Sequence, residues 1–388
     1  MFKQVLLDSC YCSPIGHSEA EVRQSLKSGR SGIVSLADLF PEESEPFLHT
    51  GAVIQPAADF PDASDLHPRI SPRYARVLGG FCRALEQLAL RAGQVDQLYL
   101  IHRQHFFSEW ADPRVEFDEW EFVGRFLARS GLEVAPSEVI CLHAACSSGL
   151  VALNLALREL RRQPKKRILV VGLESELNHE RFVSIKKLGA LSAEKDPTRS
   201  CMPFSRQRSG LVPGEVMVAV LLGSRPEEEL EPGDIVLTAG VSNSDASRLT
   251  DCLESGEFLA RCLTQPLSQA PHGVDFVCPH GTSTPLNDGV EGAVLDRVFG
   301  GAPTPMRVVP LKQYLGHTLN SSGLWEAVLN ADFLRHNYLP PLLATDALEP
   351  FEQLTFLESC QELPLSRALK VSVGFGGINA SVLIEKVT

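Results

Sequence analysis

The sequence lacks long apolar runs: no segment approaches the ~18 consecutive apolar residues that a membrane-spanning helix requires. The apolar run within residues 1–8 is also too short for a secretory signal peptide. A basic excess is missing as well, because the formal net charge is -12 at pH 7. An acidic chain of this kind argues against nonspecific nucleic-acid binding. We therefore expect a cytoplasmic protein with no membrane span.

Pairs of cysteines or histidines at zinc-ligand spacing are absent too. The 10 cysteines are scattered over 388 residues, and Cys10 and Cys12 have no second pair to complete a site. Others, such as Cys141 and Cys278, lie in apolar, strand-like segments. The cysteines therefore indicate reduced thiols, mostly in the core, and we expect no metal site.

No short repeat, low-complexity tract or heptad pattern is evident, which excludes solenoid and fibrous folds. Runs rich in Val and Ile alternate instead with amphipathic segments, the pattern of an α/β protein with buried, largely parallel strands. Predicted strands are 4–7, 97–101, 139–142, 167–171, 216–222, 235–239, 276–278, 308–310, 369–373 and 380–384. Predicted helices are 74–92, 117–130, 148–160, 289–299 and 322–336. A charged, proline-bearing stretch at 224–234 suggests two units, residues 1–230 and 231–388.

A cysteine stands where one predicted strand turns into a helix. Cys146 follows the strand at 139–142 through a turn of small residues and precedes the helix at 148–160. Unpaired backbone N–H groups and the positive end of the helix dipole at such a position favour the nucleophilic thiolate. The alternative, a small apolar side chain packed at a helix start, stays open from this segment alone.

Two histidines and a glycine-rich turn occupy polar loops farther along. His280 follows the predicted strand at 276–278, and His317 lies in a similar loop between glycines 316 and 323. Loops after strand ends are where α/β proteins build active sites, so these two with Cys146 indicate catalysis. The turn Gly374-Phe375-Gly376-Gly377 permits positive φ and could offer a backbone N–H to an anion, although a plain hairpin turn is the simpler alternative.

These motifs together resemble the β-ketoacyl-ACP synthases of the thiolase superfamily, of the elongating type with a Cys-His-His triad. The family places its nucleophile in an Ala-Cys-Ser context, as at Cys146, and its histidines in His-Gly-Thr and Gly-His, as at His280 and His317. A second cysteine near the closing glycines, which thiolases need, is missing, and the type III synthases carry Asn in place of His317. The resemblance implies a five-layered αβαβα sandwich of two pseudo-repeated halves.

The resemblance also implies roles for these residues. Cys146 would take an acyl group from a thioester, with the backbone N–H groups of Cys146 and Phe375 as the oxyanion hole and the turn that carries Phe375 as a gate. His280 and His317 would then stabilise the enolate formed when malonyl-carrier loses CO2, without any resident cofactor. Lys312 would orient the histidines, and we expect it to pair with Glu291.

The implied partners are an acyl carrier protein, which brings its own phosphopantetheine, and either a second copy of the chain or a chain-length-factor-like subunit. Acidic carriers need a basic dock, for which Arg69, Arg73, Arg206 and Arg208 are candidates. A further basic group at 158–167 is more simply a solvated helix end. Ser147-Ser148 favours a polyketide or polyene pathway over fatty-acid elongation. Alternatives are an acyltransferase without decarboxylation, a non-catalytic chain-length factor and an unrelated α/β domain.

Overall fold

A computed structural model describes residues 1–37, 49–67, 70–102, 118–175, 177–246, 255–302, 304–344 and 348–388 of the chain. Its centre is an 11-stranded mixed sheet with the order β12-β10-β9-β14-β15-β8-β1-β7-β6-β4-β5. The strands of this sheet are β1 (Phe2–Cys12), β4 (Gln97–His102), β5 (Val139–Cys141), β6 (Ile168–Ser175), β7 (Glu215–Pro226), β8 (Ile235–Ser244), β9 (Phe276–Cys278), β10 (Met306–Val308), β12 (Leu354–Thr355), β14 (Arg367–Gly374) and β15 (Ile378–Lys386).

The sheet consists of two stretches with the same topology. In the first, β1, β7 and β6 are antiparallel neighbours, and β6, β4 and β5 are parallel neighbours. In the second, β8, β15 and β14 are antiparallel, and β14, β9 and β10 are parallel. The two stretches meet where Val5 pairs with Val236 and Leu6 with Ile235. Strand order and direction therefore repeat, as two pseudo-repeated halves require.

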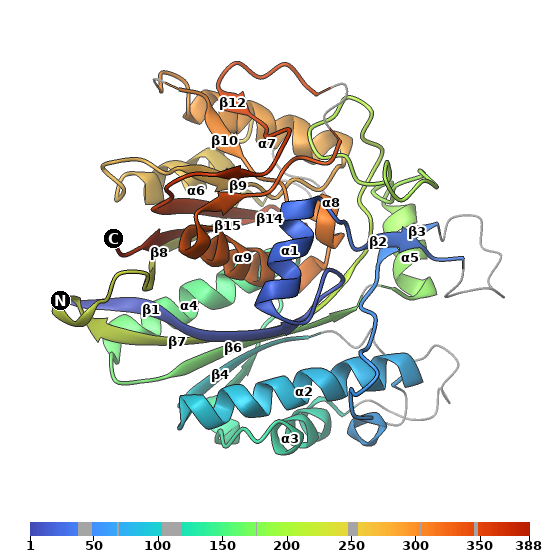
Figure 1. Ribbon diagram of the computed structural model, residues 1–388, viewed down its shortest axis with the longest axis vertical. Helices are drawn as coiled ribbons and strands as arrows, with labels where there is room; N and C mark the ends of the chain where they lie inside the picture. The colour runs from blue at the N-terminus through green and yellow to red at the C-terminus, as the bar shows by residue number, and fades with distance from the viewer. Residues whose placement is uncertain are drawn as a thin grey trace.

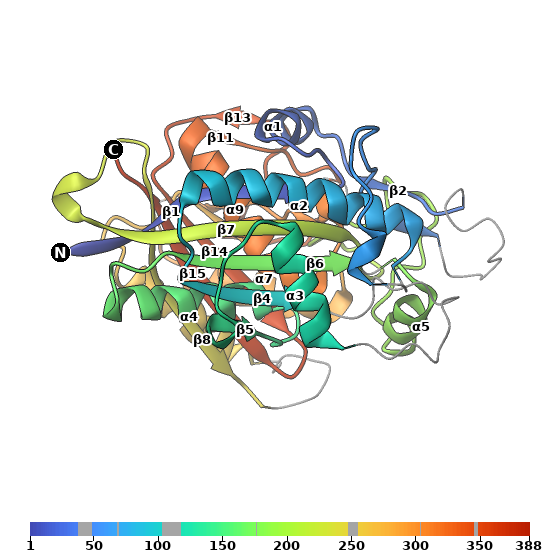
Figure 2. The same cartoon turned by 90° about the horizontal axis from the view of Figure 1, so that it is seen from below.

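The helices complete five layers (Figure 1). They are α1 (Glu19–Ser28), α2 (Pro72–Ala92), α3 (Glu119–Arg129), α4 (Ser148–Arg162), α5 (His179–Lys187), α6 (Glu257–Leu267), α7 (Pro285–Val298), α8 (Lys312–Leu315) and α9 (Ser322–His336). Helices α4 and α9 lie in the middle, between the two halves of the sheet. Helices α2 and α3 cover one outer face, seen from below in Figure 2, and α6 and α7 cover the other. The predicted αβαβα sandwich is confirmed.

Alternating side chains of each strand explain the layers. On β6, Ile168 and Val170 belong to the central core with α4 and α9, whereas Leu169 and Val171 belong to the outer core with α2 and α3. On β14, Leu369 packs into the opposite outer core with α6 and α7. Strand β6 thus buries both faces, and it is therefore apolar at most positions.

The sequence pattern was misleading in three respects. The strands are not largely parallel, because antiparallel strands buried on both faces are as uniformly apolar as parallel ones. Helices α1, α5 and α6 were not predicted; α1 buries only Val22, Ser25 and Leu26, and α6 contains Pro266. A short repeat does exist, since residues 147–150 and 321–324 are both Ser-Ser-Gly-Leu.

The remaining short elements are β2 (Ile33–Ser35), β3 (Thr50–Ala52), β11 (Tyr338–Leu339) and β13 (Gln361–Glu362), with 3-10 turns at Ser64–Leu66, Pro136–Glu138, Glu227–Glu229 and Leu319–Ser321. The stretch between β7 and β8 includes the charged segment expected to divide the chain, and the boundary at 230/231 stays a prediction. Within the described ranges, no helix is both long enough and apolar enough to cross a membrane.

The repeated Ser-Ser-Gly-Leu segments start the two central helices and cross in close contact. A Cβ added to Gly149 of α4 would lie 2.5 Å from the backbone nitrogen of Leu324 in α9. A Cβ added to Gly323 of α9 would lie 2.8 Å from Cγ of Leu150 in α4. Each helix therefore needs glycine where it meets the other.

Two glycine-to-alanine substitutions should change stability in opposite directions. Gly149→Ala should lower the free energy of unfolding by about 1–3 kcal/mol, because the new methyl group meets backbone that cannot move freely. Gly124→Ala, in α3 with no atom within 4 Å of the added Cβ, should raise it by about 0.5–1 kcal/mol through helix propensity. Urea unfolding of both variants measures this, and equal effects would contradict the packing described here.

Candidate active site

Cys146 stands on a strained turn between β5 and α4. The residue before it, Ala145, has φ 48°, in the left-handed region that a non-glycine residue seldom adopts. The Ser148 hydroxyl holds the turn by accepting from the Ala144 N–H at 2.7 Å and donating to the Ala145 carbonyl at 2.6 Å. The Ser147 hydroxyl donates to the Ile378 carbonyl of β15 at 2.7 Å. The turn thus attaches the first half of the sheet to the second.

Both predicted histidines lie beside Cys146. His280 follows β9 and His317 follows α8, and their ring centroids are 5.1 Å apart. One ring nitrogen of each histidine and Sγ of Cys146 all lie within 4.8 Å of one another. All three residues are buried, with exposed fractions of 5% for Cys146, 4% for His280 and 2% for His317. The structure therefore brings together a thiol and two imidazoles that are far apart in the sequence.

The loop that carries His317 is held by a segment from the first half of the chain. The His317 N–H donates to the Val212 carbonyl at 2.6 Å, and the Gly214 N–H donates to the His317 carbonyl at 3.1 Å. This segment ends a Pro-, Phe- and Gly-containing stretch at 202–215. It therefore helps to set the position of the imidazole beside Cys146.

Two cavities meet at Cys146. The larger, of about 250 Å³, is lined by both histidines, by Thr282, Thr284 and Asn287, and by Leu188, Gly189 and Ala190 after α5. The smaller, of about 110 Å³, is mostly apolar; its lining includes Ile185, Leu188, Leu211 and Leu319. Residues of α5 and of the loop that follows it were not predicted to line a cavity, because nothing in their local sequence distinguishes them from ordinary surface residues.

Phe375 lines both cavities with Cys146. The turn around it has the predicted positive φ at Gly376 (81°) and Gly377 (71°). A Cβ added to Gly374 would lie 3.3 Å from the backbone nitrogen of Cys146, so this turn approaches the cysteine closely. That approach is suited to two N–H groups acting on one oxyanion, and both this role and a gating role for Phe375 stay predictions.

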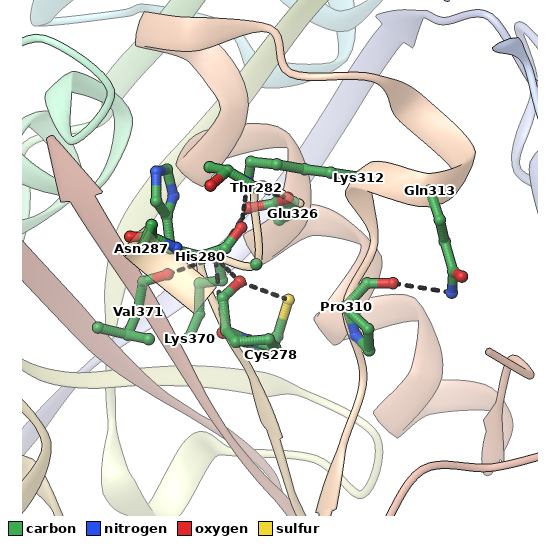
Figure 3. Close-up of polar contacts among 12 residues, drawn as sticks. Cys278, His280, Thr282, Asn287, Pro310, Lys312, Gln313, Glu326, Lys370 and Val371 are labelled. Carbon is green, nitrogen blue, oxygen red and sulfur yellow. Dashed lines mark hydrogen bonds and ion pairs between the residues drawn. The ribbon is translucent and has the colours of Figure 1, made fainter. Parts of the chain in front are cut away.

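Lys312 is buried behind His280, but its carboxylate partner is not Glu291. Its Nζ donates to the His280 carbonyl and lies 2.9 Å from Oε1 of Glu326 on α9 (Figure 3). Glu291 instead accepts from the His280 N–H at 2.6 Å and the Gly281 N–H at 2.8 Å. The expected Lys312–Glu291 pair is therefore wrong. A lone glutamate in the apolar helix 322–336, fourteen residues after Lys312, was the available signal.

Burial keeps both histidines neutral. It lowers the pKa of His280 well below its usual value, and the charges of Lys312, His317 and Lys370 lower it further. Burial likewise lowers the pKa of His317, with Lys312 and Lys370 adding to the effect. A neutral imidazole can donate one hydrogen bond to a carbonyl oxygen without protonating a carbanion beside it.

The four arginines expected to dock a carrier differ in their surroundings. Arg69 lies outside the described residues. Arg73 pairs with the buried Glu215, with Nη1 2.8 Å from Oε2, and Arg208 pairs with Glu349 at 2.9 Å and donates to the Pro285 carbonyl at 2.9 Å. Both side chains thus have internal partners, and their docking roles stay predictions. Arg206 is exposed, and its docking role stays a prediction.

A metal ion was not expected, and the structure leaves that expectation as a prediction. The sulfur of Cys146 and the nitrogens of both histidines are close enough to ligate one ion, as are groups of His102, Glu119 and Cys141 elsewhere. The first set offers sulfur and nitrogen and the second offers sulfur, nitrogen and a carboxylate oxygen, all of which zinc accepts.

Comparison with known proteins identifies related domains along most of the chain. Residues 136–228 match the beta-ketoacyl synthase N-terminal domain, and residues 235–346 match the beta-ketoacyl synthase C-terminal domain. The chain is 26% identical over 248 residues to 3-oxoacyl-[acyl-carrier-protein] synthase 2 of Staphylococcus aureus. The aligned region covers 62% of this chain and 60% of that protein. It is 30% identical over 260 residues to the highly reducing polyketide synthase ALT1 of Alternaria alternata, covering 63% of this chain but 10% of that protein.

A solved structure supports the fold over the whole chain. A type II polyketide ketosynthase, bound to the hexaketide and in complex with its acyl-carrier protein, superimposes with a TM-score of 0.78 at 20% identity. The superposition covers 99% of each chain.

Stability should depend on pH through the two histidines. Their folded-state pKa values are depressed, so below pH ~6.5 the unfolded chain binds protons that the folded chain does not. The free energy of unfolding should therefore fall as pH falls, by up to about 1.4 kcal/mol per pH unit for each histidine.

Urea unfolding of the wild type, His280→Gln and His317→Gln, between about pH 7.5 and pH 5, measures this. In each variant, the free energy of unfolding should depend less steeply on pH than in the wild type. Glu291, whose pKa burial raises to about 7, is common to all three proteins, so its contribution cancels in the comparison. Identical slopes would show that the histidines are not buried in neutral form.

Proposed function

Because the chain belongs to the β-ketoacyl synthase family, we propose that it condenses an acyl thioester with malonyl-carrier, with loss of CO2, in fatty-acid or polyketide synthesis. The observation that supports this most is the convergence of Cys146, His280 and His317, whose reactive atoms lie within 4.8 Å of one another where two cavities meet. A nucleophile with a cavity on either side can hold one substrate while a second one enters.

In the first stage, Sγ of Cys146 attacks the acyl thioester carbonyl. The carbonyl oxygen becomes an oxyanion, for which the backbone N–H groups of Cys146 and Phe375 are the proposed donors, each contributing about 3 kcal/mol. The tetrahedral intermediate collapses, the carrier leaves as its thiol, and the acyl group stays on sulfur. The mostly apolar cavity of about 110 Å³ is the proposed place for the acyl chain.

In the second stage, malonyl-carrier enters the larger cavity and its thioester carbonyl accepts hydrogen bonds from the neutral His280 and His317. The bond between the malonyl α-carbon and the carboxylate breaks, and CO2 leaves. The electron pair of that bond stays with the α-carbon and forms an enolate with the thioester carbonyl. The α-carbon then attacks the acyl carbonyl on Cys146, and the cysteine leaves as thiolate. Neither stage needs a resident cofactor, because the thioester arm arrives on the carrier.

The polar groups of the larger cavity suit such an arm. Thr282 and Thr284 place hydroxyl groups 2.9 Å apart there, beside the side-chain amide of Asn287. Hydroxyl and amide groups can pair with the two amides of phosphopantetheine. We therefore propose an acyl carrier protein as partner. A second copy of the chain or a chain-length-factor-like subunit is the proposed assembly partner.

Replacing the nucleophile should abolish acyl transfer. Wild type and Cys360→Ala, which removes a partly exposed thiol elsewhere, should both gain the mass of the acyl group from a panel of acyl-carriers, and Cys146→Ala should not. Intact-protein mass spectrometry measures this. Acyl mass on Cys146→Ala would remove Cys146 from the mechanism, and discharge of the acyl-enzyme to alcohols or amines only would make the protein an acyltransferase.

Docking should depend on the exposed Arg206. Arg206→Glu should raise the KM for malonyl-carrier about tenfold, in line with the loss of roughly 1.4 kcal/mol of electrostatic attraction, and leave kinetics with malonyl-pantetheine unchanged. Steady-state kinetics with both substrates, at fixed ionic strength, provides the measurement. An equal effect on both substrates would show that the substitution acts on the site and not on carrier docking.

A further inference from the structure

A second buried lysine stands behind the histidines and is not used in the chemistry above. Lys370 lies on β14 between Leu369 and Val371, with an exposed fraction of 0%. A lysine inside a buried strand carries a large desolvation cost, which close partners must offset. Its surroundings should therefore explain why a charge is present there.

Oxygen atoms surround the Lys370 ammonium group (Figure 3). Nζ lies 2.8 Å from Oε2 of Glu326, 2.8 Å from the Pro279 carbonyl and 3.5 Å from the Cys278 carbonyl, and it also donates to the Val371 carbonyl. One carboxylate with several main-chain carbonyls is a set of hard oxygen ligands, of the kind that holds a monovalent cation. Lys370 therefore supplies a cation that is covalently attached to the chain.

Glu326 is shared between two lysines. Its Oε1 lies 2.9 Å from Lys312 and its Oε2 2.8 Å from Lys370, and all three side chains are at most 1% exposed. One carboxylate cannot neutralise two ammonium groups, so the cluster has one net positive charge. Burial alone lowers the pKa of Lys370, but the charges of its neighbours, Glu326 among them, raise it above the usual value. Lys370 thus stays charged in the folded protein.

The cluster holds the backbone that leads into His280. Lys370 donates to the carbonyls of Cys278 and Pro279, and Lys312 donates to the next carbonyl, that of His280. From the other side, Glu291 binds the N–H groups of His280 and Gly281. The two lysines therefore bind the carbonyls and Glu291 binds the N–H groups. Together they fix the backbone that carries the His280 imidazole.

We propose that Lys370 is a positioning residue of the condensation site, acting as a tethered monovalent cation that fixes the backbone of 278–280 and adds positive charge behind the two histidines. The role rests on the proposed function, since it concerns the second stage of that reaction. Lys370 is thus a second cation on the carboxylate of Glu326, contributed by strand β14, whereas Lys312 lies on helix α8.

Lys370→Ala removes the ammonium group and leaves its oxygen ligands. Acyl transfer to Cys146 should persist, because the cluster does not contact the cysteine turn, whereas condensation should fall about 10²-fold through displacement of His280. Potassium chloride or ammonium chloride should restore most of the loss, and tetramethylammonium chloride at the same ionic strength should not. Lys370→Met, which fills the space without charge, should be impaired and not rescued by any of the three salts.

Two further readouts separate this role from simple stability. Removing a positive charge raises the pKa of nearby histidines, so the acidic limb of the condensation rate should move to higher pH in Lys370→Met, which retains most of the packing volume. The Tm of Lys370→Ala should rise in potassium chloride relative to tetramethylammonium chloride, while the Tm values of wild type and Lys370→Met should not.

The Tm measurement needs no activity, so it remains decisive if the wild type proves not to condense, an outcome that would remove the proposed function alone. The proposal is overturned if Lys370→Ala shows the same Tm in both salts, or if Lys370→Met condenses at the wild-type rate with an unmoved acidic limb. If Lys370→Ala does not fold, the pH profile of Lys370→Met decides.

Discussion

The close crossing of α4 and α9 is the constraint on which the site depends. Gly149 and Gly323 allow each helix start to lie against the other, in two segments with the same Ser-Ser-Gly-Leu sequence. Because Cys146 precedes one helix and His317 precedes the other, this contact brings a nucleophile from one half next to an imidazole from the other. The duplicated architecture thus produces an asymmetric pair of functional groups at one point.

Burial determines the electrostatics around that point. The chain carries a formal charge of -12, yet the groups behind the histidines are two lysines that share Glu326. Local positive charge and burial together hold His280 and His317 in the neutral state that carbanion stabilisation needs. The overall charge of the protein therefore says little about its active site, where a few buried groups determine protonation.

Local sequence was sufficient to place Cys146 at a turn and both histidines in loops, whereas their roles came from the family resemblance and stay predictions. Cys146 was predicted because a thiol at a strand-to-helix turn has a recognisable pattern, and His280 and His317 because each follows a structured segment in a polar loop. The partner of Lys312 was mispredicted because Glu291 and Glu326 each lie on the helix that follows one of the histidines. Only the fold shows which glutamate reaches the lysine. The ion pairs of Arg73 and Arg208 could not be predicted for a similar reason, since Glu215 and Glu349 lie more than a hundred residues away.

The proposed reaction couples one acyl group on Cys146 to one decarboxylation directed by the two histidines in a single site. Single-turnover reaction of pre-acylated enzyme with malonyl-carrier labelled with carbon-13 in its carboxylate tests this most directly. The account predicts one labelled CO2 for each acyl group, released together with a 3-oxoacyl product two carbons longer. Loss of the acyl group as free acid, or release of CO2 without product, would contradict it.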